Sequence, residues 1–209
     1  MTPADRIDEP LEGIRIWSTF SPEHRVELGS SAVLTPEGWW VFDPIPIVPA
    51  PVEPLFDRVA GIVLTNANHE RDSVRWCDRF ACRRWAAPDA DGLPEEIGRW
   101  TRSDPFPGWV LIPLSGGAPG ETAFFRPDRS LLVVGDALVN LPGRGLEILP
   151  DKYCTNPTQL RESLRHLPVA DLILTAHGAP FTGREVSTLL GISDCESSFC
   201  WDSNHGGSA

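Results

Sequence analysis

Three short polar segments follow apolar runs in this chain, and they hold residue types that bind metals or move protons. They are Leu64-Thr65-Asn66-Ala67-Asn68-His69-Glu70-Arg71, Gly135-Asp136 and Ala176-His177-Gly178. Imidazole and carboxylate groups are common ligands of catalytic zinc, and histidine exchanges protons near neutral pH. The first segment lies between an apolar run at residues 60–64 and a helical pattern that begins at residue 71. A strand that ends in such a loop projects side chains into a cleft, so these segments predict one polar site.

Taken together, the three segments resemble the metal-binding framework of the metallo-β-lactamase superfamily. In that family the first segment reads Thr-His-x-His-x-Asp-His after a strand, the second reads Gly-Asp, and the third reads Gly-His-Gly or similar. The family's Asp-Pro at a strand end has a counterpart in Asp43-Pro44. The resemblance covers about residues 14–190. It implies an α/β (α+β) fold, the four-layer αββα sandwich of the family, with a site that holds two metal ions.

Most of the family's ligands are replaced in this sequence. The family pattern places Thr65 at the leading Thr, Asn66 and Asn68 at the two His, Glu70 at the Asp, Arg71 at the final His of the segment, Asp136 at the Gly-Asp carboxylate and His177 at the last His. His69 falls in a spacer position. A further family ligand is the His of a Pro-Gly-His segment. We align that segment with Leu114-Ser115-Gly116-Gly117, which gives Gly117 at the ligand position.

The number of remaining ligands predicts one metal ion at most. A catalytic zinc needs about three protein ligands and an open position, and a two-metal site needs more. The candidate ligands are His69, Glu70, Asp136 and His177. We therefore expect either no cofactor or a single weakly held divalent ion, which would be zinc, iron or manganese.

Arg71 introduces a permanent positive charge where the family has a ligand. At about 4 Å, with an effective dielectric constant near 20, a guanidinium repels a divalent ion by roughly 8 kcal/mol before relaxation. The same charge could neutralise Asp136 and Glu70, so we hypothesise that Arg71 replaces the metal electrostatically. The candidate catalytic residues are His177, Asp136 and Arg71, with His177 as base and Arg71 as electrophile in a metal-free arrangement.

Several of these residues also have a purely structural interpretation. Asn66 and Asn68 suit the caps of a helix and the backbone groups of a loop. His69 could be an ordinary loop histidine. Asp136 and His177 end apolar strands and would be half-buried, so each of them needs a polar partner.

Two classes of function remain open at this point. The first is a hydrolase-like protein that acts on a small ester, thioester or lactone. The second is a non-catalytic pseudoenzyme that binds a small molecule or regulates a partner on the same fold. The loss of ligands favours the second class, and the general activity of the family favours the first. The sequence leaves open whether the protein is an enzyme.

Composition limits the cell compartment and the partners. The chain has 209 residues, 41% of them hydrophobic, and a formal net charge of -11. Nucleic acids and acidic membranes bind proteins through Lys and Arg, so this charge argues against both partners and leaves a small molecule. Because no apolar leader and no membrane-spanning run is visible, we expect a cytoplasmic protein with reduced thiols.

Hydrophobic periodicity predicts the elements that must position the site. Strands are expected at residues 14–18, 31–34, 39–43, 60–64, 109–112, 122–125, 130–134 and 171–175, and helices at residues 71–86, 156–166 and 184–190. Residues 44–54 are rich in proline and predict an extended crossover, and residues 88–108 predict a surface excursion. We assign residues 1–192 to a single domain. Residues 193–209, with Cys195 and Cys200, predict a disordered tail.

Overall fold

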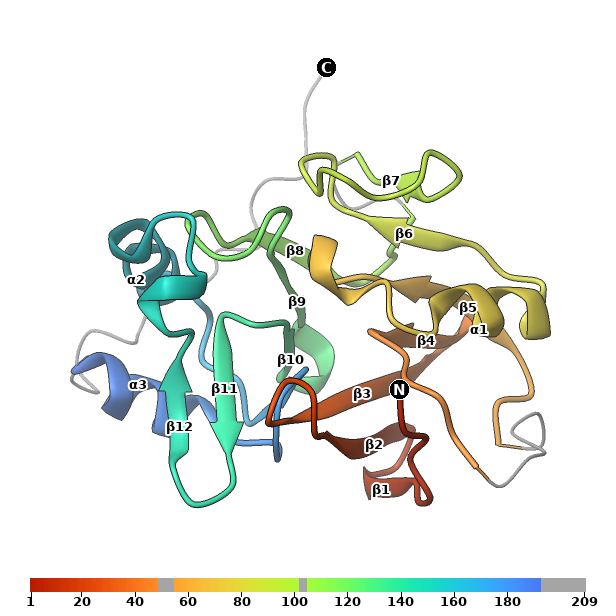
Figure 1. Ribbon diagram of the computed structural model, residues 1–209, viewed down its shortest axis with the longest axis horizontal. Helices are drawn as coiled ribbons and strands as arrows, with labels where there is room; N and C mark the ends of the chain where they lie inside the picture. The colour runs from red at the N-terminus through yellow and green to blue at the C-terminus, as the bar shows by residue number, and fades with distance from the viewer. Residues whose placement is uncertain (49–54, 102–104, 193–209) are drawn as a thin grey trace.

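Two β-sheets stand face to face at the centre of the molecule, with helices on the outside (Figure 1). The structure is a computed structural model that describes residues 1–48, 55–101 and 105–192. The first sheet has the strand order β1-β2-β3-β4-β5-β6-β7, and the second has the order β13-β10-β9-β8. A separate pair, β11 and β12, forms a two-stranded sheet. The expected tail at residues 193–209 and part of the expected crossover lie outside the described residues.

The strands of the first sheet are β1 (Asp8–Leu11), β2 (Ile14–Ser21), β3 (Val26–Thr35), β4 (Gly38–Phe42), β5 (Val59–Val63), β6 (Arg84–Ala86) and β7 (Gly98–Arg99). The remaining strands are β8 (Val110–Pro113), β9 (Thr122–Arg126), β10 (Leu131–Val134), β11 (Leu138–Leu141), β12 (Gly145–Ile148) and β13 (Leu172–Thr175). The α-helices are α1 (Ser73–Phe80), α2 (Pro157–Arg165) and α3 (Gly183–Leu190), and short 3₁₀ turns span Ala67–His69, Pro127–Arg129 and Asp151–Tyr153.

The first sheet changes from antiparallel to parallel along its length. Strands β1 to β4 form an antiparallel meander, and the predicted hairpin is present as β3 and β4. Strands β4, β5 and β6 then run parallel to one another, so their ends lie at the same edge. The residues after β4 and β5 start the polar site. This parallel arrangement therefore brings segments far apart in sequence to a common edge.

The second sheet is buried on both faces, as the alternation of its side chains shows. Leu131 and Val133 belong to the larger core cluster, together with residues of the first sheet. Leu132 and Val134, which point the other way along β10, belong to a second cluster with Leu160 of α2 and with residues of α3. Successive side chains in a strand point to opposite faces, so one face meets the first sheet and the other meets the helices. Helix α1 covers the first sheet, which gives the four expected layers.

Helix α1 is shorter than the periodicity predicted. It ends at Phe80, because Ala81 takes a left-handed conformation with φ of 49° and its N–H caps the carbonyl of Cys77. Residues 84–86 form strand β6 in place of the predicted last helical turns. Charged and aromatic residues in this stretch fit both periods, and pairing with β5 decides in favour of the strand.

Residues 88–108 are not the surface excursion that composition predicted. They contain β7 and the buried side chains of Ile97, Trp100 and Phe106. Both Trp100 and Phe106 pack edge to face on Phe124 of the second sheet. The segment therefore helps to close the core between the sheets. None of the helices in the described part of the chain has the length and apolar character that a membrane crossing requires.

Phe124 should be essential for the stability of the sandwich. Its side chain is fully buried and contacts Phe42 as well as the two aromatic rings named above. Phe124→Ala leaves a cavity between the sheets, and we expect it to lower the free energy of unfolding by about 3–5 kcal/mol. Phe20→Ala is the matched control, because Phe20 is 59% exposed. Equal effects of both variants in urea denaturation would contradict this view of the core.

Candidate functional site

Asp43 organises the start of the site by joining the ends of β4 and β5. Its carboxylate accepts hydrogen bonds from the backbone N–H of Thr65 at 2.8 Å and from the Thr65 hydroxyl at 2.6 Å. The same carboxylate lies 3.0 Å from Nδ1 of His69. Asp43 is buried and has a φ of 49°, a left-handed conformation that a residue other than glycine rarely adopts. The carboxylate thus fixes both the loop after β5 and the orientation of the His69 ring.

His69, Asp136 and His177 meet around one carboxylate oxygen. Oδ1 of Asp136 lies 3.0 Å from Nε2 of His69 and 2.8 Å from Nε2 of His177. The other ring nitrogen of His177 lies 3.0 Å from the carbonyl oxygen of Glu27 in β3. The ligand atoms of these three residues all lie within 4.8 Å of one another. The three polar segments of the sequence are therefore brought together in space.

Asn66 and Glu121 fill the neighbouring position. The amide nitrogen of Asn66 donates to Oε2 of Glu121 at 2.8 Å and to Oδ2 of Asp136 at 3.2 Å. Oε1 of Glu121 accepts the backbone N–H of Ala137 at 3.1 Å. The side-chain oxygen of Asn66 also caps the 3₁₀ turn by accepting the N–H of Asn68, as the capping interpretation predicted. The side chain of Asn68 is exposed.

Glu121 is the site residue that the sequence analysis missed. We aligned the family's Pro-Gly-His segment with residues 114–117, but the residue beside Asn66 is Glu121. The available signal was Pro119-Gly120-Glu121, which directly precedes β9 and differs from Pro-Gly-His only in its last residue. Gly135 completes this corner, since a Cβ there would overlap the Thr65 hydroxyl and lie 2.7 Å from Glu121. The Gly of Gly-Asp is thus required by close approach.

Arg71 lies inside the site, but it bonds to the backbone more than to acids. Its Nη1 donates to the carbonyl oxygens of Gly29 at 2.6 Å and Asp43 at 3.0 Å, and Nη2 donates to Ala176 at 3.3 Å. Nη2 also lies 3.3 Å from Nε2 of His69. The guanidinium therefore ties together β3 and the ends of β4 and β13. No described hydrogen bond joins it to the carboxylate of Asp136 or Glu70.

Glu70 is not brought to the cluster. Its carboxylate accepts a hydrogen bond from Arg84 at 3.0 Å, and Arg84 also pairs with Glu96 at 3.1 Å. Of the four candidate metal ligands, the structure thus brings together His69, Asp136 and His177 and directs Glu70 elsewhere.

Burial and mutual charge shift the pKa values of this cluster strongly. Burial and the Arg71 guanidinium oppose the charged form of His69, but the carboxylates of Asp136 and Asp43 outweigh them and raise its pKa to about 9. Burial and the charge of Asp136 raise the pKa of Glu121 to about 8. The pKa of Asp136 is held well below its usual value by His69 and His177 despite burial. Negative charge on Asp43 and Asp136 thus favours a cation at the ring nitrogens.

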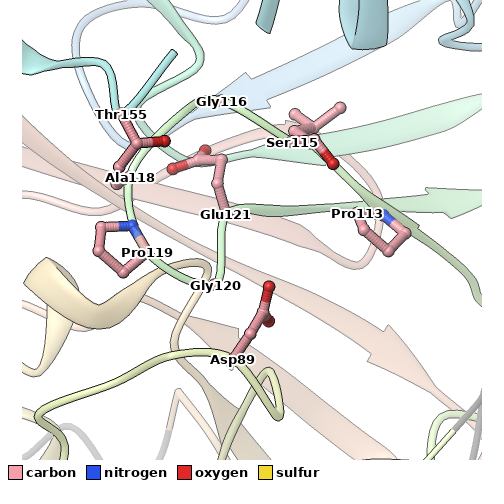
Figure 2. Close-up of a pocket in the computed structure, with 10 residues that line it drawn as sticks. Asp89, Pro113, Ser115, Gly116, Ala118, Pro119, Gly120, Glu121 and Thr155 are labelled. Atoms are coloured by element: carbon pink, nitrogen blue, oxygen red, sulfur yellow. The ribbon is translucent and has the colours of Figure 1, made fainter. Parts of the chain in front are cut away.

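A pocket adjoins the cluster on the side of Glu121. Its volume is about 220 Å³, and its lining includes Ser115, Glu121, Thr155 and Asp89. The loop that carries Ser115 curls around the Glu121 side chain, and Asp89 lies beyond Gly120 (Figure 2). Glu121 is therefore shared between this pocket and the buried cluster.

The donor set fits one divalent metal ion and does not fit two. A ring nitrogen that faces an oxygen acceptor carries the proton, so the contacts with Asp43 and Glu27 leave Nε2 of both histidines available. Two imidazole nitrogens and one carboxylate oxygen suit zinc with an open fourth position. The place of a second ion is taken by the Asn66 amide, whose hydrogens face Glu121 and Asp136. The structure thus offers a possible His/Asp/His site.

Comparison with known proteins identifies the family. The family model for the metallo-β-lactamase superfamily matches residues 10–177. The chain belongs to the metallo-β-lactamase superfamily. Among curated proteins, no sequence matches it.

Solved structures of metallo-β-lactamases share the fold of this superfamily member. The DIM-1 metallo-β-lactamase has a TM-score of 0.67 and 16% identity over 90% of this chain and 98% of its own. The enzyme from Erythrobacter litoralis has a TM-score of 0.68 and 16% identity over 89% and 94% of the two chains. That from Pontibacter korlensis has a TM-score of 0.66 and 15% identity over 90% and 97%. At this identity the likeness shows the fold alone, and the expected mixed α/β metallo-β-lactamase architecture is confirmed.

The raised pKa values predict that the protein, stripped of metal by a chelator, loses stability as pH rises. The folded state binds the Glu121 proton with a pKa of about 8 against 4.5 unfolded, and that of His69 with about 9 against 6.5. Each contribution is complete below the unfolded pKa and is lost as pH rises through the folded one. We expect the free energy of unfolding to fall by more than about 1 kcal/mol between pH 6 and 9.

Glu121→Gln tests the source of this slope, because the amide mimics the protonated acid. Urea denaturation of this variant should give a flatter pH profile between pH 5 and 8. Glu162→Gln, at an exposed carboxyl on α2, is the control and should keep the wild-type slope. A wild-type slope in Glu121→Gln, or a gain in wild-type stability with rising pH, would refute the assignment.

Proposed function

We propose that this superfamily member is a hydrolase-like protein that binds one divalent metal ion and cleaves a small ester, thioester or lactone. The observation that carries the proposal is the convergence of His69, Asp136 and His177 around one point, with ligand atoms within 4.8 Å. Their side chains are 4%, 12% and 13% exposed, so the site is shielded but reached from one side. Shielding strengthens the interaction between these ligands and a bound cation.

A metal ion at this point would supply Lewis-acid polarisation of a carbonyl group and a water molecule with lowered pKa. The protein supplies the orientation of the ligands. Asp43 holds the ring of His69 from behind, and the Glu27 carbonyl holds that of His177 in the same way. Such partners fix the ring and raise the basicity of the ligating nitrogen. Arg71 fixes the three backbone segments that carry these groups.

Protons and metal compete for the same nitrogen atoms in this proposal. The two carboxylates that raise the pKa of His69 would equally attract a divalent ion. A ligand nitrogen must lose its proton before it binds a metal, so metal affinity should increase with pH. Arg71, whose Nη2 lies near Nε2 of His69, reduces the affinity without closing the site. This balance supports a weakly held ion.

The second candidate function is a non-catalytic protein that binds a small molecule on the same fold. The observation in its favour is the Asn66 amide between Glu121 and Asp136, which replaces a ligand by a hydrogen-bond donor. The two candidates differ in metal content. A protein that binds no divalent ion at neutral pH and turns over no ester would be a pseudoenzyme.

Metal analysis is the first test of the hydrolase proposal. We expect elemental analysis of protein purified without chelators, or reloaded with zinc or manganese, to give one equivalent of metal and not two. Asp136→Ala and His177→Ala should each weaken zinc binding by about tenfold or more, because each removes a ligand of a three-ligand site. The same variants should abolish turnover of 4-nitrophenyl acetate, a thioester and a lactone.

His166→Ala and Glu70→Gln are the controls for these variants. His166 is an exposed histidine on the far side of α2, and Glu70 pairs with Arg84 outside the cluster. Both variants should retain metal and activity. Loss of metal in Glu70→Gln would contradict the ligand set, and unchanged activity in Asp136→Ala and His177→Ala would remove the enzyme proposal.

Asp43→Asn tests the role of the carboxylate behind His69. The variant keeps the volume of the side chain but removes the charge that orients and polarises the ring. We expect zinc affinity to fall by about 10–100-fold, the usual effect of losing such a partner. Circular dichroism should show the wild-type fold, and Asp171→Asn, at an exposed position, should bind zinc normally. Wild-type zinc affinity in Asp43→Asn would show that His69 is not a ligand.

A further inference from the structure

A second cavity lies at the opposite edge of the first sheet from the metal site. Its volume is about 340 Å³, and its walls are Glu37, Trp40, Arg58 and Val59, Ala60, Arg83 and Trp85, with Pro105. Glu37, Arg58 and Arg83 come just before β4, β5 and β6, whereas Asp43 and Thr65 come after β4 and β5. Because these strands run parallel, the starts and ends lie at opposite edges. This cavity is therefore separate from the site described above.

Two polar atoms on the walls of this cavity lack a partner among the described residues. Nε1 of Trp40 is buried and makes no hydrogen bond, and Oε2 of Glu37 is in the same state. Trp40 as a whole is 3% exposed. An unpaired buried polar group costs about 1–3 kcal/mol, and such groups in native proteins call for an explanation. One donor and one acceptor thus await a partner on the same cavity.

Two arginines give the cavity a positive balance in an acidic protein. Within the described part of the chain, no hydrogen bond or ion pair is found for the guanidinium of Arg58 or Arg83. Glu37 is the one acidic residue of the lining, against these two cations. The chain as a whole has a net charge of -11. A local excess of guanidinium groups favours an anion, and carboxylates match the planar geometry of arginine.

The indole rings of Trp40 and Trp85 give the cavity flat apolar walls. The ring of Trp40 lies directly on the backbone of Gly61, where a Cβ would overlap it. The ring of Trp85 lies on Gly98 in the same way, with 2.7 Å between a Cβ at Gly98 and the ring. Phe106 supports the Trp40 ring from within the core, with 4.7 Å between the ring centroids. Flat aromatic surfaces of this kind stack on planar ligands.

We propose that this cavity binds a small organic carboxylate with a flat apolar body and one hydroxyl or amino group. The carboxylate pairs with Arg58 and Arg83, the flat body lies along the indole rings, and the hydroxyl or amino group donates to Glu37. The Trp40 indole N–H donates to an oxygen of the same ligand. The volume lies within the range of about 300–1,000 Å³ that is usual for small-molecule sites. This inference does not depend on the metal site.

The test uses 4-hydroxybenzoate as the probe, with chelator present so that the metal site does not contribute. Calorimetry should show saturable binding, and the ¹⁵N–¹H spectrum should show a shift of the Trp40 indole N–H, assigned by its loss in Trp40→Phe. The neutral analogue 4-hydroxybenzamide should bind at least about tenfold more weakly, because it lacks the charge that pairs with arginine. Benzoate, which lacks the hydroxyl donor, should also bind more weakly than the probe.

Arg58→Gln and Arg83→Gln are the deciding variants, because both side chains are exposed and their removal leaves the core intact. Each should weaken 4-hydroxybenzoate binding by about tenfold. Arg165→Gln, at an exposed position at the end of α2, is the matched control and should bind as the wild type does. The proposal is overturned by the absence of saturable binding, by equal binding of the benzamide, or by normal binding in both arginine variants. Loss of hydrolytic activity in other variants has no bearing on this result.

Discussion

The buried carboxylate of Asp43 is the interaction on which the rest of the site depends. It accepts the backbone and side-chain hydrogens of Thr65 and lies in contact with His69, so one anion joins the ends of two strands to a histidine ring. Its own backbone carbonyl accepts from Arg71 and from Ser30. A buried charge is stable only when it is paired and hydrogen-bonded, and here those same bonds build the loop.

Charge balance explains why the cluster remains polar in the interior of the protein. Asp43 and Asp136 supply two negative charges, and Arg71 supplies one permanent positive charge. The remaining charge is compensated at the ring nitrogens of His69 and His177, by protons or by a metal ion. The site therefore keeps a demand for a cation even though the ligand set of the superfamily is reduced. Loss of ligands has changed the stoichiometry of the site more than its electrostatic character.

The superfamily fold survives these replacements because the backbone is held by other groups. Arg71 joins β3 to the ends of β4 and β13 through carbonyl oxygens, and Asn66 joins the loop after β5 to Glu121 and Asp136. Hydrogen bonds of this kind hold the loops in place without a second ion. The protein thus combines an αββα sandwich with a site in which side-chain bonds replace part of the metal coordination.

The sequence by itself determined the strands that end at Asp43, Thr65, Asp136 and His177, because apolar runs and polar strand ends are local features. It also indicated the family and the candidate ligands Asp136, His177 and His69. Only the tertiary structure decided that Arg84–Ala86 is a strand, that Glu70 pairs with Arg84, and that Glu121 and not Gly117 faces Asn66. These outcomes depend on partners far away in the sequence, which local periodicity and spacing do not encode. The direction of a loop side chain is fixed by the packing of both sheets, and that packing exists only in the folded chain.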